Sequence, residues 1–399
     1  MNILVIGNGF DLAHGLPTKY TDFLEWIKKY KEFYSYATRK RSAKYCETED
    51  SILRYFNNLF YCSEMDYICD EIYNLVKDNV WIDYFLNTFL SNKENWIDFE
   101  SEICHVIQSL DSDIHGLSGG SSMDDDVEYL SNMFLNERYS EYIHVVQPTN
   151  YNERITYKKI RDQLYKDLNR LIRAFEIYLA EYVEKIQICK ISPDIESLKI
   201  DHIISFNYTT IFPKLYKLTK KIGETDTESF DYIHGKADIN NTIDTNNMVL
   251  GIDEYLGKKR RNKNIEFIAF KKYYQRIYKG TGCKYKDWID EIREDRKEIE
   301  RREGKEISTQ IPFKQCIGKH HLLYIFGHSL DVTDKDILKD LILNDNVKTT
   351  IFYHDKETLG QQIANLVKVI GQDELIRRTG GSTRTIGFKL QQPMQSIKE

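Results

Sequence analysis

The sequence predicts an α/β protein with a parallel sheet and a large, mainly helical insertion after the first strand. Short apolar runs alternate with amphipathic helical patterns, which is typical of a parallel sheet covered by helices on both faces. A length of 399 residues exceeds that of most single domains, so two domains or one domain with a large insertion is expected.

The first strand is expected at residues 2–6, a continuous apolar run that ends at Gly7. From Thr21 to about residue 190 the pattern becomes helical. It is clearest from Tyr157 to Ile188, where apolar residues recur every three or four positions. The helical pattern ends at Ser192-Pro193-Asp194, because proline cannot continue a helix.

These boundaries divide the chain into an α/β nucleotide-binding domain, residues 1–19 and 196–399, and a helical insertion, residues 20–195. Within the insertion, residues 117–126 read as a flexible acidic loop, and residues 147–150 form a second break.

Strand patterns return after the insertion, and helical patterns at 336–343 and 361–370 separate several of them. The expected strands are 202–206, 230–233, 248–250, 321–326 and 349–353. The first strand must join this sheet across the insertion.

The net charge of the chain excludes few classes of partner. The net charge of −6 arises from 56 basic and 62 acidic residues, a balance too mild to demand nucleic acid or an acidic partner. The basic run 258–263, followed by Lys271, Lys272 and Arg276, could contact phosphates. A solvated helical face explains such a run more often, so nucleic acid is an unlikely partner.

A cytoplasmic location is expected, because the start of the chain lacks a basic signal region and no later stretch is apolar enough to cross a bilayer. The seven cysteines form no Cys-x-x-Cys pair, which indicates neither a disulfide framework nor a zinc ribbon. No metal is expected.

The turn after the first strand reads Gly7-Asn8-Gly9-Phe10-Asp11. Glycines in such a turn let backbone N–H groups approach a phosphate, because glycine has no Cβ and tolerates positive φ. The dehydrogenase fingerprint has a third glycine where this chain has Leu12, which disfavours hydride transfer. A turn that binds no ligand remains an alternative.

Polar groups follow three more predicted strands: Asn207-Tyr208-Thr209, His234-Gly235 and the segment Gly327–Asp331. Parallel sheets bind ligands at the carboxyl ends of their strands. Each group alone could be a turn, a satisfied histidine or a helix cap. Four such strand ends in one sheet favour a binding site.

The segment Gly7–Pro17 resembles the first loop of sirtuin-like proteins, in which Gly-Ala-Gly is followed by a small residue and by Gly-Ile-Pro. Ser205–Thr209 is similar to that family's Asn-containing strand end, Ile233-His234-Gly235 to its His-Gly, and Gly327–Leu330 to its Gly-x-Ser-Leu.

A closer resemblance is to the AbiH family of phage abortive-infection proteins. It is carried by Ile6–Thr18, by Trp96–Glu100 and by Phe326–Asp334, and it spans nearly the whole chain. The resemblance to sirtuin-like proteins implies a sirtuin-like, Rossmann-type sheet. The resemblance to the AbiH family implies a role in phage defence.

The resemblance implies a reaction on NAD in which the nicotinamide–ribose bond breaks. Asn207 would orient a water or the ribose hydroxyls, and His234 would act as general base. Gly7 and Gly9 would admit the pyrophosphate, while Asp11 would accept from a ribose hydroxyl or cap the turn. The ligand-binding residues expected on this basis are Gly7, Asn8, Gly9, Phe10, Asp11, Thr209, Gly327 and Ser329.

The chain also departs from the sirtuin-like pattern. Thr209 stands where those enzymes have an Asp that helps to recognise the nicotinamide carboxamide, and the paired Cys-x-x-Cys motifs of their zinc module are missing. An NAD hydrolase or a non-catalytic nucleotide sensor therefore fits better than a deacylase. A nucleic-acid binder or nuclease is the third hypothesis.

Asp98 and Glu100 lie at an expected helix start, where acidic residues complement the helix dipole. Glu100 could instead reach the cleft if the insertion folds over the sheet edge. The partners expected are a dinucleotide and either a second copy of the chain or a phage-derived trigger, with no membrane.

Overall fold

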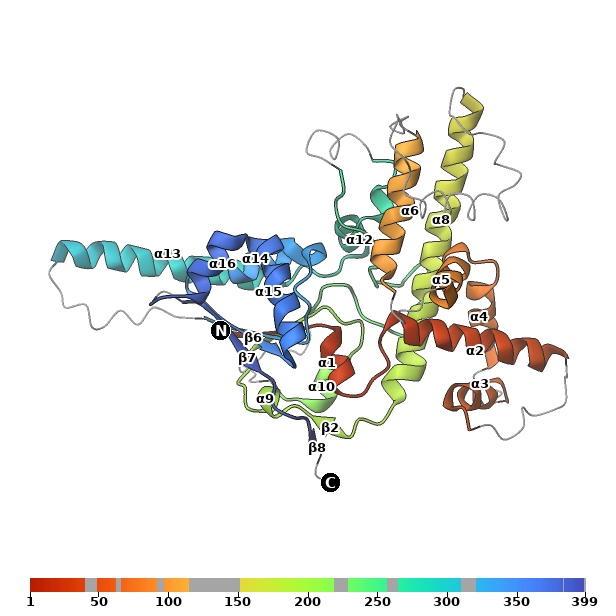
Figure 1. The fold of residues 1–399 in the computed structure, drawn as a ribbon, viewed down its shortest axis with the longest axis horizontal. Coiled ribbons are helices and arrows are strands. Elements are labelled where there is room, and N and C mark those ends of the chain that lie inside the picture. Colours follow the sequence, from red (N-terminus) through yellow and green to blue (C-terminus); the bar gives the residue numbers. More distant parts are fainter. Residues whose placement is uncertain are drawn as a thin grey trace. The chain divides into compact units, whose positions relative to one another are not determined.

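The computed structural model describes residues 1–39, 49–61, 66–91, 97–114, 151–218, 229–256, 265–309, 321–382 and 384–397. Its elements form two compact units (Figure 1). The sheet unit comprises residues 1–17, 186–236 and 280–399, and the helical unit comprises residues 18–185 and 237–279.

The sheet unit is built on six parallel strands, which confirms the expected α/β class and the parallel sheet. In chain order they are β1 (Asn2–Ile6), β3 (His202–Ser205), β4 (Phe230–Tyr232), β5 (His321–Phe326), β6 (Val347–Tyr353) and β7 (Ile386–Leu390). Their spatial order is β4-β3-β1-β5-β6-β7, so the strands counted along the chain lie in the order 3-2-1-4-5-6.

The strand register brings four strand ends to one level. Ile6 of β1 lies beside both Ser205 of β3 and Phe326 of β5, and Ser205 lies beside Tyr232 of β4. The residues that follow these strands therefore emerge along a single edge, as the sequence predicts for the carboxyl ends of parallel strands.

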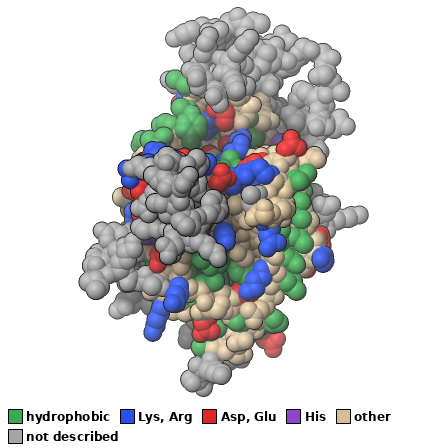
Figure 2. All heavy atoms as spheres, turned by 90° about the vertical axis from the view of Figure 1, so that its left-hand side faces the viewer, with side chains coloured by type: hydrophobic (Ala, Val, Ile, Leu, Met, Phe, Trp, Pro, Cys, Tyr) green, Lys and Arg blue, Asp and Glu red, His purple; other side chains and the backbone are tan. Residues whose placement is uncertain are grey.

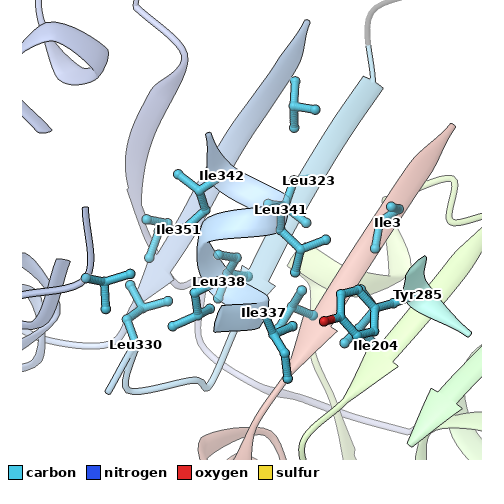
Figure 3. Close-up of a cluster of buried hydrophobic side chains, with 14 of the residues drawn as sticks. Ile3, Ile204, Tyr285, Leu323, Leu330, Ile337, Leu338, Leu341, Ile342 and Ile351 are labelled. Atoms are coloured by element: carbon cyan, nitrogen blue, oxygen red, sulfur yellow. The ribbon is translucent and has the colours of Figure 1, made fainter. Parts of the chain in front are cut away.

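Helices α13 to α16 pack against the sheet around one apolar cluster (Figure 3). Ile337 and Leu341 of α14 are at most 1% exposed, and they meet Ile3 of β1 and Leu323 of β5 in this cluster. The helices of the sheet unit are α1 (Asn8–Ala13), α9 (Pro193–Glu196), α10 (Phe212–Leu215), α13 (Tyr285–Thr309), η5 (Val332–Asp334), α14 (Lys335–Ile342), α15 (Lys356–Ile370) and α16 (Gln372–Thr379). A two-stranded antiparallel sheet pairs β2 (Lys190–Ile191) with β8 (Gln395–Ser396).

The helical unit has an aromatic core that includes Phe23, Trp26, Phe85 and Phe99, none of which has exposed surface. The rings of Phe85 and Phe99 stack with centroids 4.1 Å apart. Its helices are α2 (Tyr20–Arg39), α3 (Ser51–Tyr61), α4 (Asp66–Val76), α5 (Val80–Ser91), α6 (Phe99–Ile114), α8 (Tyr151–Ile177), the π-helix η2 (Tyr178–Tyr182), the short η3 (Val183–Lys185) and η4 (Ile268–Phe270), and α12 (Lys272–Lys279).

The helical unit also takes in residues 237–279, which the sequence assigned to the α/β domain. Buried Glu176 of α8 holds the start of this segment within the helical unit, because its carboxylate accepts hydrogen bonds from the backbone N–H of Asp238 and from the side chain of Asn241. Residues 248–250 are buried in the helical unit but form no strand, so the prediction of a strand at 248–250 was wrong. The Leu250 N–H donates to the side chain of Gln275 instead of to a ladder.

The predicted loops 117–126 and 147–150 and the basic run 258–263 lie outside the described residues. Within the described part of the chain, no helix combines the length and the apolar character that a membrane crossing requires.

Candidate functional site

The turn after β1 packs directly on the turn after β5. Gly7 N donates to Phe326 O over 3.3 Å, and Gly9 N donates to Gly327 O over 2.8 Å. Gly327 has φ of +68°, and a Cβ on it would lie 2.2 Å from Phe10 N. Glycine is thus required at position 327 by both backbone conformation and space.

A Cβ on Gly7 or Gly9 would also come within 3 Å of this second turn. The contact between the two turns therefore explains the Gly-x-Gly pattern without a ligand. Because both N–H groups already donate inside the protein, a pyrophosphate at these two glycines would compete with existing hydrogen bonds.

Asp11 and Thr209 meet at the same edge. The hydroxyl of Thr209 donates to Oδ2 of Asp11 over 2.7 Å, and the two residues are 4% and 1% exposed, respectively. A buried carboxylate from the first turn therefore stands beside the hydroxyl that follows β3.

Asn207 is buried, and its main chain is fixed by Ser205. The Ser205 hydroxyl donates to the Asn207 carbonyl over 3.1 Å and accepts from the Asn207 N–H over 3.2 Å. The side-chain Nδ2 is also buried, and it has no hydrogen-bond partner among the residues that the structure describes. A buried donor in this state costs roughly 1–3 kcal/mol, so this amide is a candidate for a hydrogen bond to a ligand or a water.

His234 and His328 both face the carboxylate of Asp334. Nε2 of His234 lies 3.3 Å from Oδ1, and Nε2 of His328 lies 3.6 Å from Oδ2. All three residues are buried. The ring of Phe206 packs edge-on against both imidazoles, with centroids 5.5 Å from His234 and 4.3 Å from His328.

The segment that carries His328 is held from behind by α15. Gln362 donates to the carbonyl of His328 over 3.3 Å, and Asn365 donates to the carbonyl of Ser329 over 2.9 Å. Leu330 takes a φ of +61°, which is rare for a residue with a Cβ and often marks a functional segment.

The structure thus brings Asp11, Asn207, Thr209 and His234 to one edge of the sheet. Of the other expected ligand residues, Asn8 and Ser329 are exposed, whereas Phe10 has no exposed surface. The Phe10 ring packs on His14 and Phe212, which are also core contacts.

Sequence reasoning missed the roles of His328 and Asp334. Both belong to the segment Phe326–Asp334 that resembles the AbiH family, yet only Gly327 and Ser329 were selected from it. The available signal was a His two residues and an Asp eight residues after the end of a predicted strand. No group of three or more His, Cys, Asp or Glu placed to hold a metal occurs in the described part of the chain.

His14, in the first turn, has a structural role. Its Nδ1 lies 2.7 Å from the Phe10 carbonyl and must therefore carry the proton, so Nε2 accepts from the Tyr216 hydroxyl over 2.8 Å. That hydroxyl in turn accepts from Ser192 N–H over 2.7 Å. Burial lowers the pKa of His14, which keeps the ring neutral.

Asp98 and Glu100 lie at the start of α6, as expected from acidic residues that complement a helix dipole. Asp98 accepts from the Glu100 N–H and from the Ser101 hydroxyl, as a helix cap does. Glu100 forms an ion pair of 2.6 Å with Lys272 inside the helical unit. Both acids therefore have local structural partners.

The described lysines that suggested a nucleic-acid interface also form ion pairs within the protein. Lys271 pairs with both oxygens of Glu254 at 2.8 Å, and Lys272 pairs with Glu100. Figure 2 shows Lys and Arg side chains spread over one face with Asp and Glu among them. These contacts do not favour a basic stripe for phosphates.

One family model matches residues 3–354 and is described as bacteriophage abortive infection AbiH. The chain belongs to the AbiH family. The match includes every residue of the candidate site and five strands of the sheet in full or nearly so. Membership indicates a role in phage abortive infection. A search of curated proteins and a search of solved structures each gave no match.

Proposed function

We propose that this AbiH protein acts in abortive infection by binding NAD at the carboxyl edge of its sheet and hydrolysing it to nicotinamide and ADP-ribose. The observation that carries the proposal is the pair of buried groups at neighbouring strand ends. Asn207 holds an amide donor with no partner in the described structure, and His234 faces a carboxylate. An unsatisfied donor and an oriented base at neighbouring strand ends suit a hydroxylated substrate and a water.

The strand order supports this choice of ligand. The order 3-2-1-4-5-6 is that of doubly wound sheets that bind dinucleotides where the strand order reverses, between the first and fourth strands. In this chain those strands are β1 and β5, and the segments that follow them carry Asp11, in α1, and His328. The sirtuin-like part of the proposal rests on this order together with the motif resemblance.

Asn207 and His234 would share the chemistry. The amide of Asn207 donates to a ribose hydroxyl or to the attacking water, and His234 accepts the proton of that water. The water oxygen bonds to ribose C1′ as the bond from C1′ to the nicotinamide nitrogen breaks. The products are nicotinamide, ADP-ribose and one proton. General-base assistance of this kind typically contributes about 10²- to 10⁴-fold in rate.

Asp11 would take the part that sirtuin-like proteins give to the Asp after their Asn. Its carboxylate lies within hydrogen-bond distance of Thr209, the residue at that position here. A carboxylate at this place can accept from the N–H of a carboxamide.

The test is an assay of nicotinamide and ADP-ribose released from NAD by the purified full chain, with and without lysate of phage-infected cells as a source of trigger. We expect Asn207→Ala and His234→Ala to lower turnover by about 10²-fold or more, and Asn240→Ala, an exposed asparagine of the helical unit, to leave it unchanged. Absence of product in both conditions, or full turnover by Asn207→Ala, would sink the proposal.

The second candidate is a nucleotide sensor without turnover. It is favoured by Thr209, which stands where sirtuin-like enzymes carry the Asp that helps to recognise the nicotinamide carboxamide. Calorimetry with NAD and with ADP-ribose separates the two: tight binding without product supports the sensor, and absence of binding removes both.

A further inference from the structure

We infer that Asp334 is the positioning residue of this site, whose two carboxylate oxygens hold His234 and His328 with their protons on Nε2 and so present Nδ1 of His234 as the base. The inference rests on the proposed function for its consequence in turnover. Its structural content can be tested without any substrate.

The two imidazoles come from strands that are not neighbours. His234 follows β4 and His328 follows β5, and β3 and β1 lie between these strands in the sheet. Asp334 lies 3.3 Å from one ring and 3.6 Å from the other, so a single carboxylate links the two loops across the edge.

The tautomer of His328 follows from its second contact. Leu330 N–H donates to Nδ1 of His328 over 2.9 Å, and a nitrogen that accepts a hydrogen bond carries no proton. The proton of the neutral ring is therefore on Nε2, the nitrogen that faces Asp334. This assignment comes from the contacts of both ring nitrogens.

The tautomer of His234 follows from the same carboxylate. An ionised carboxylate only accepts hydrogen bonds, so the Nε2 that faces Oδ1 is the nitrogen that carries the proton. The lone pair then lies on Nδ1. Serine-protease triads use this relation, in which a buried Asp fixes the tautomer of the catalytic His and stabilises its charged form.

The backbone around Asp334 is built to hold the carboxylate in place. Asp334 ends the short helix η5, which Asp331 caps by accepting from Thr333 N–H over 3.0 Å. The positive φ of Leu330 turns the chain into that helix. The carboxylate is thus placed by its own turn, and not by a flexible loop.

Asp334 is a charged group that faces His234 directly. The rings of Phe206 and Tyr208 and the carboxylate of Asp334 face this imidazole. When His234 takes a proton during turnover, the positive charge forms beside the carboxylate, which favours the charged ring. Removal of that charge should lower the pKa of His234 and make it a weaker base.

The first experiment is NMR of the full chain with ¹⁵N-labelled histidine, as a function of pH and without ligand. We expect both His234 and His328 in the Nε2–H form when neutral. Finding the neutral His234 ring mainly in the Nδ1–H form overturns the inference, and this result needs neither a variant nor activity.

The second experiment compares Asp334→Asn with Asp334→Glu and with Asp331→Asn, a control in the same turn whose carboxylate caps η5. Asp334→Asn should mix the tautomers of His234 and lower its titration midpoint, whereas the other two variants should keep the Nε2–H form. An unchanged His234 titration in Asp334→Asn contradicts the inference.

In the NAD assay, Asp334→Asn should lower kcat by about 10²-fold or more with KM nearly unchanged, and it should shift the acidic limb of the pH profile to lower pH. Asp334→Glu should recover part of the rate. If the wild type releases no product while its tautomers are as stated, the proposed function fails and the positioning role stands.

Discussion

The hydroxyl of Thr209 donates to Oδ2 of Asp11 over 2.7 Å and joins two segments that lie 198 residues apart in the chain. In the proposed sirtuin-like arrangement, Asp11 stands where those proteins carry a small hydroxyl residue, and Thr209 stands where they carry an Asp. The contact shows that Asp11 and Thr209 lie together in the folded protein.

The proposed exchange of the two residue types predicts that a double variant at Asp11 and Thr209 recovers the affinity for NAD. Thr209→Asp and Asp11→Thr should each lower the affinity for NAD, because each alters the number of carboxylates at a buried position. The double variant restores one carboxylate and one hydroxyl and should recover most of the loss. Calorimetry with NAD measures the coupling, and strictly additive losses would show that the pair does not act as a unit.

The packing of the two glycine turns predicts a severe effect from one methyl group. Gly327→Ala places a Cβ against Phe10 N and strains a positive φ, so we expect a loss of roughly 3 kcal/mol or more. Gly360→Ala on α15 is the matched control, since its Cβ would meet nothing within 4 Å. That variant should be stabilised by about 0.5–1 kcal/mol. Urea unfolding measures both values, and equal midpoints would contradict the packing argument.

Buried neutral histidines predict a loss of stability in mild acid. Burial lowers the pKa values of His14 and His321 in the folded protein below the ordinary value of 6.5. The unfolded chain then binds more protons as pH falls below about 6.5, so the free energy of unfolding decreases. We expect Tm to fall between about pH 7.5 and pH 5.5. His14→Gln should make this slope shallower, with the His321 contribution remaining, and an unaltered slope would exclude a role for His14.

The ion pair between Glu100 and Lys272 predicts a structural effect without a catalytic one. Lys272→Met leaves the carboxylate of Glu100 in place without its ammonium partner, which should cost about 3–5 kcal/mol. Adding Glu100→Leu should recover a large part of that stability. The double variant should keep wild-type NAD turnover, whereas a loss of turnover at restored stability would place Glu100 in the chemistry.

The sheet could be predicted wherever apolarity reflects burial within a strand. The runs at 2–6, 202–206 and 321–326 form paired strands as expected, and most of their residues are buried. Residues 248–250 are equally apolar and equally buried, yet they pack in the helical unit without a ladder. The edge strand β7 was not predicted, because only Ile386 of its five residues is buried and its pattern lacks a continuous apolar run.

The sequence predicts those residues of the candidate site that directly follow a strand. Asn207 and His234 follow their strands in the sequence, and the parallel register brings them to one edge. The bridge from Asp334 to two histidines could not be predicted, since it depends on which loops meet after folding. The same holds for the boundary at residue 237, which depends on a contact between Glu176 and Asn241, 65 residues apart.

The position of β1 in the middle of the sheet also determines when the sheet can form during translation of the chain. Its neighbours are β3 and β5, so residues 2–6 leave the ribosome almost 200 residues before β3 can pair with them. At about 5–20 residues per second this interval lasts roughly 10–40 s. The edge that carries Asp11, Asn207 and His328 is completed only after β5 has been made. A nascent chain therefore cannot assemble the candidate site until the residues of β5 and the turn that follows it have been translated.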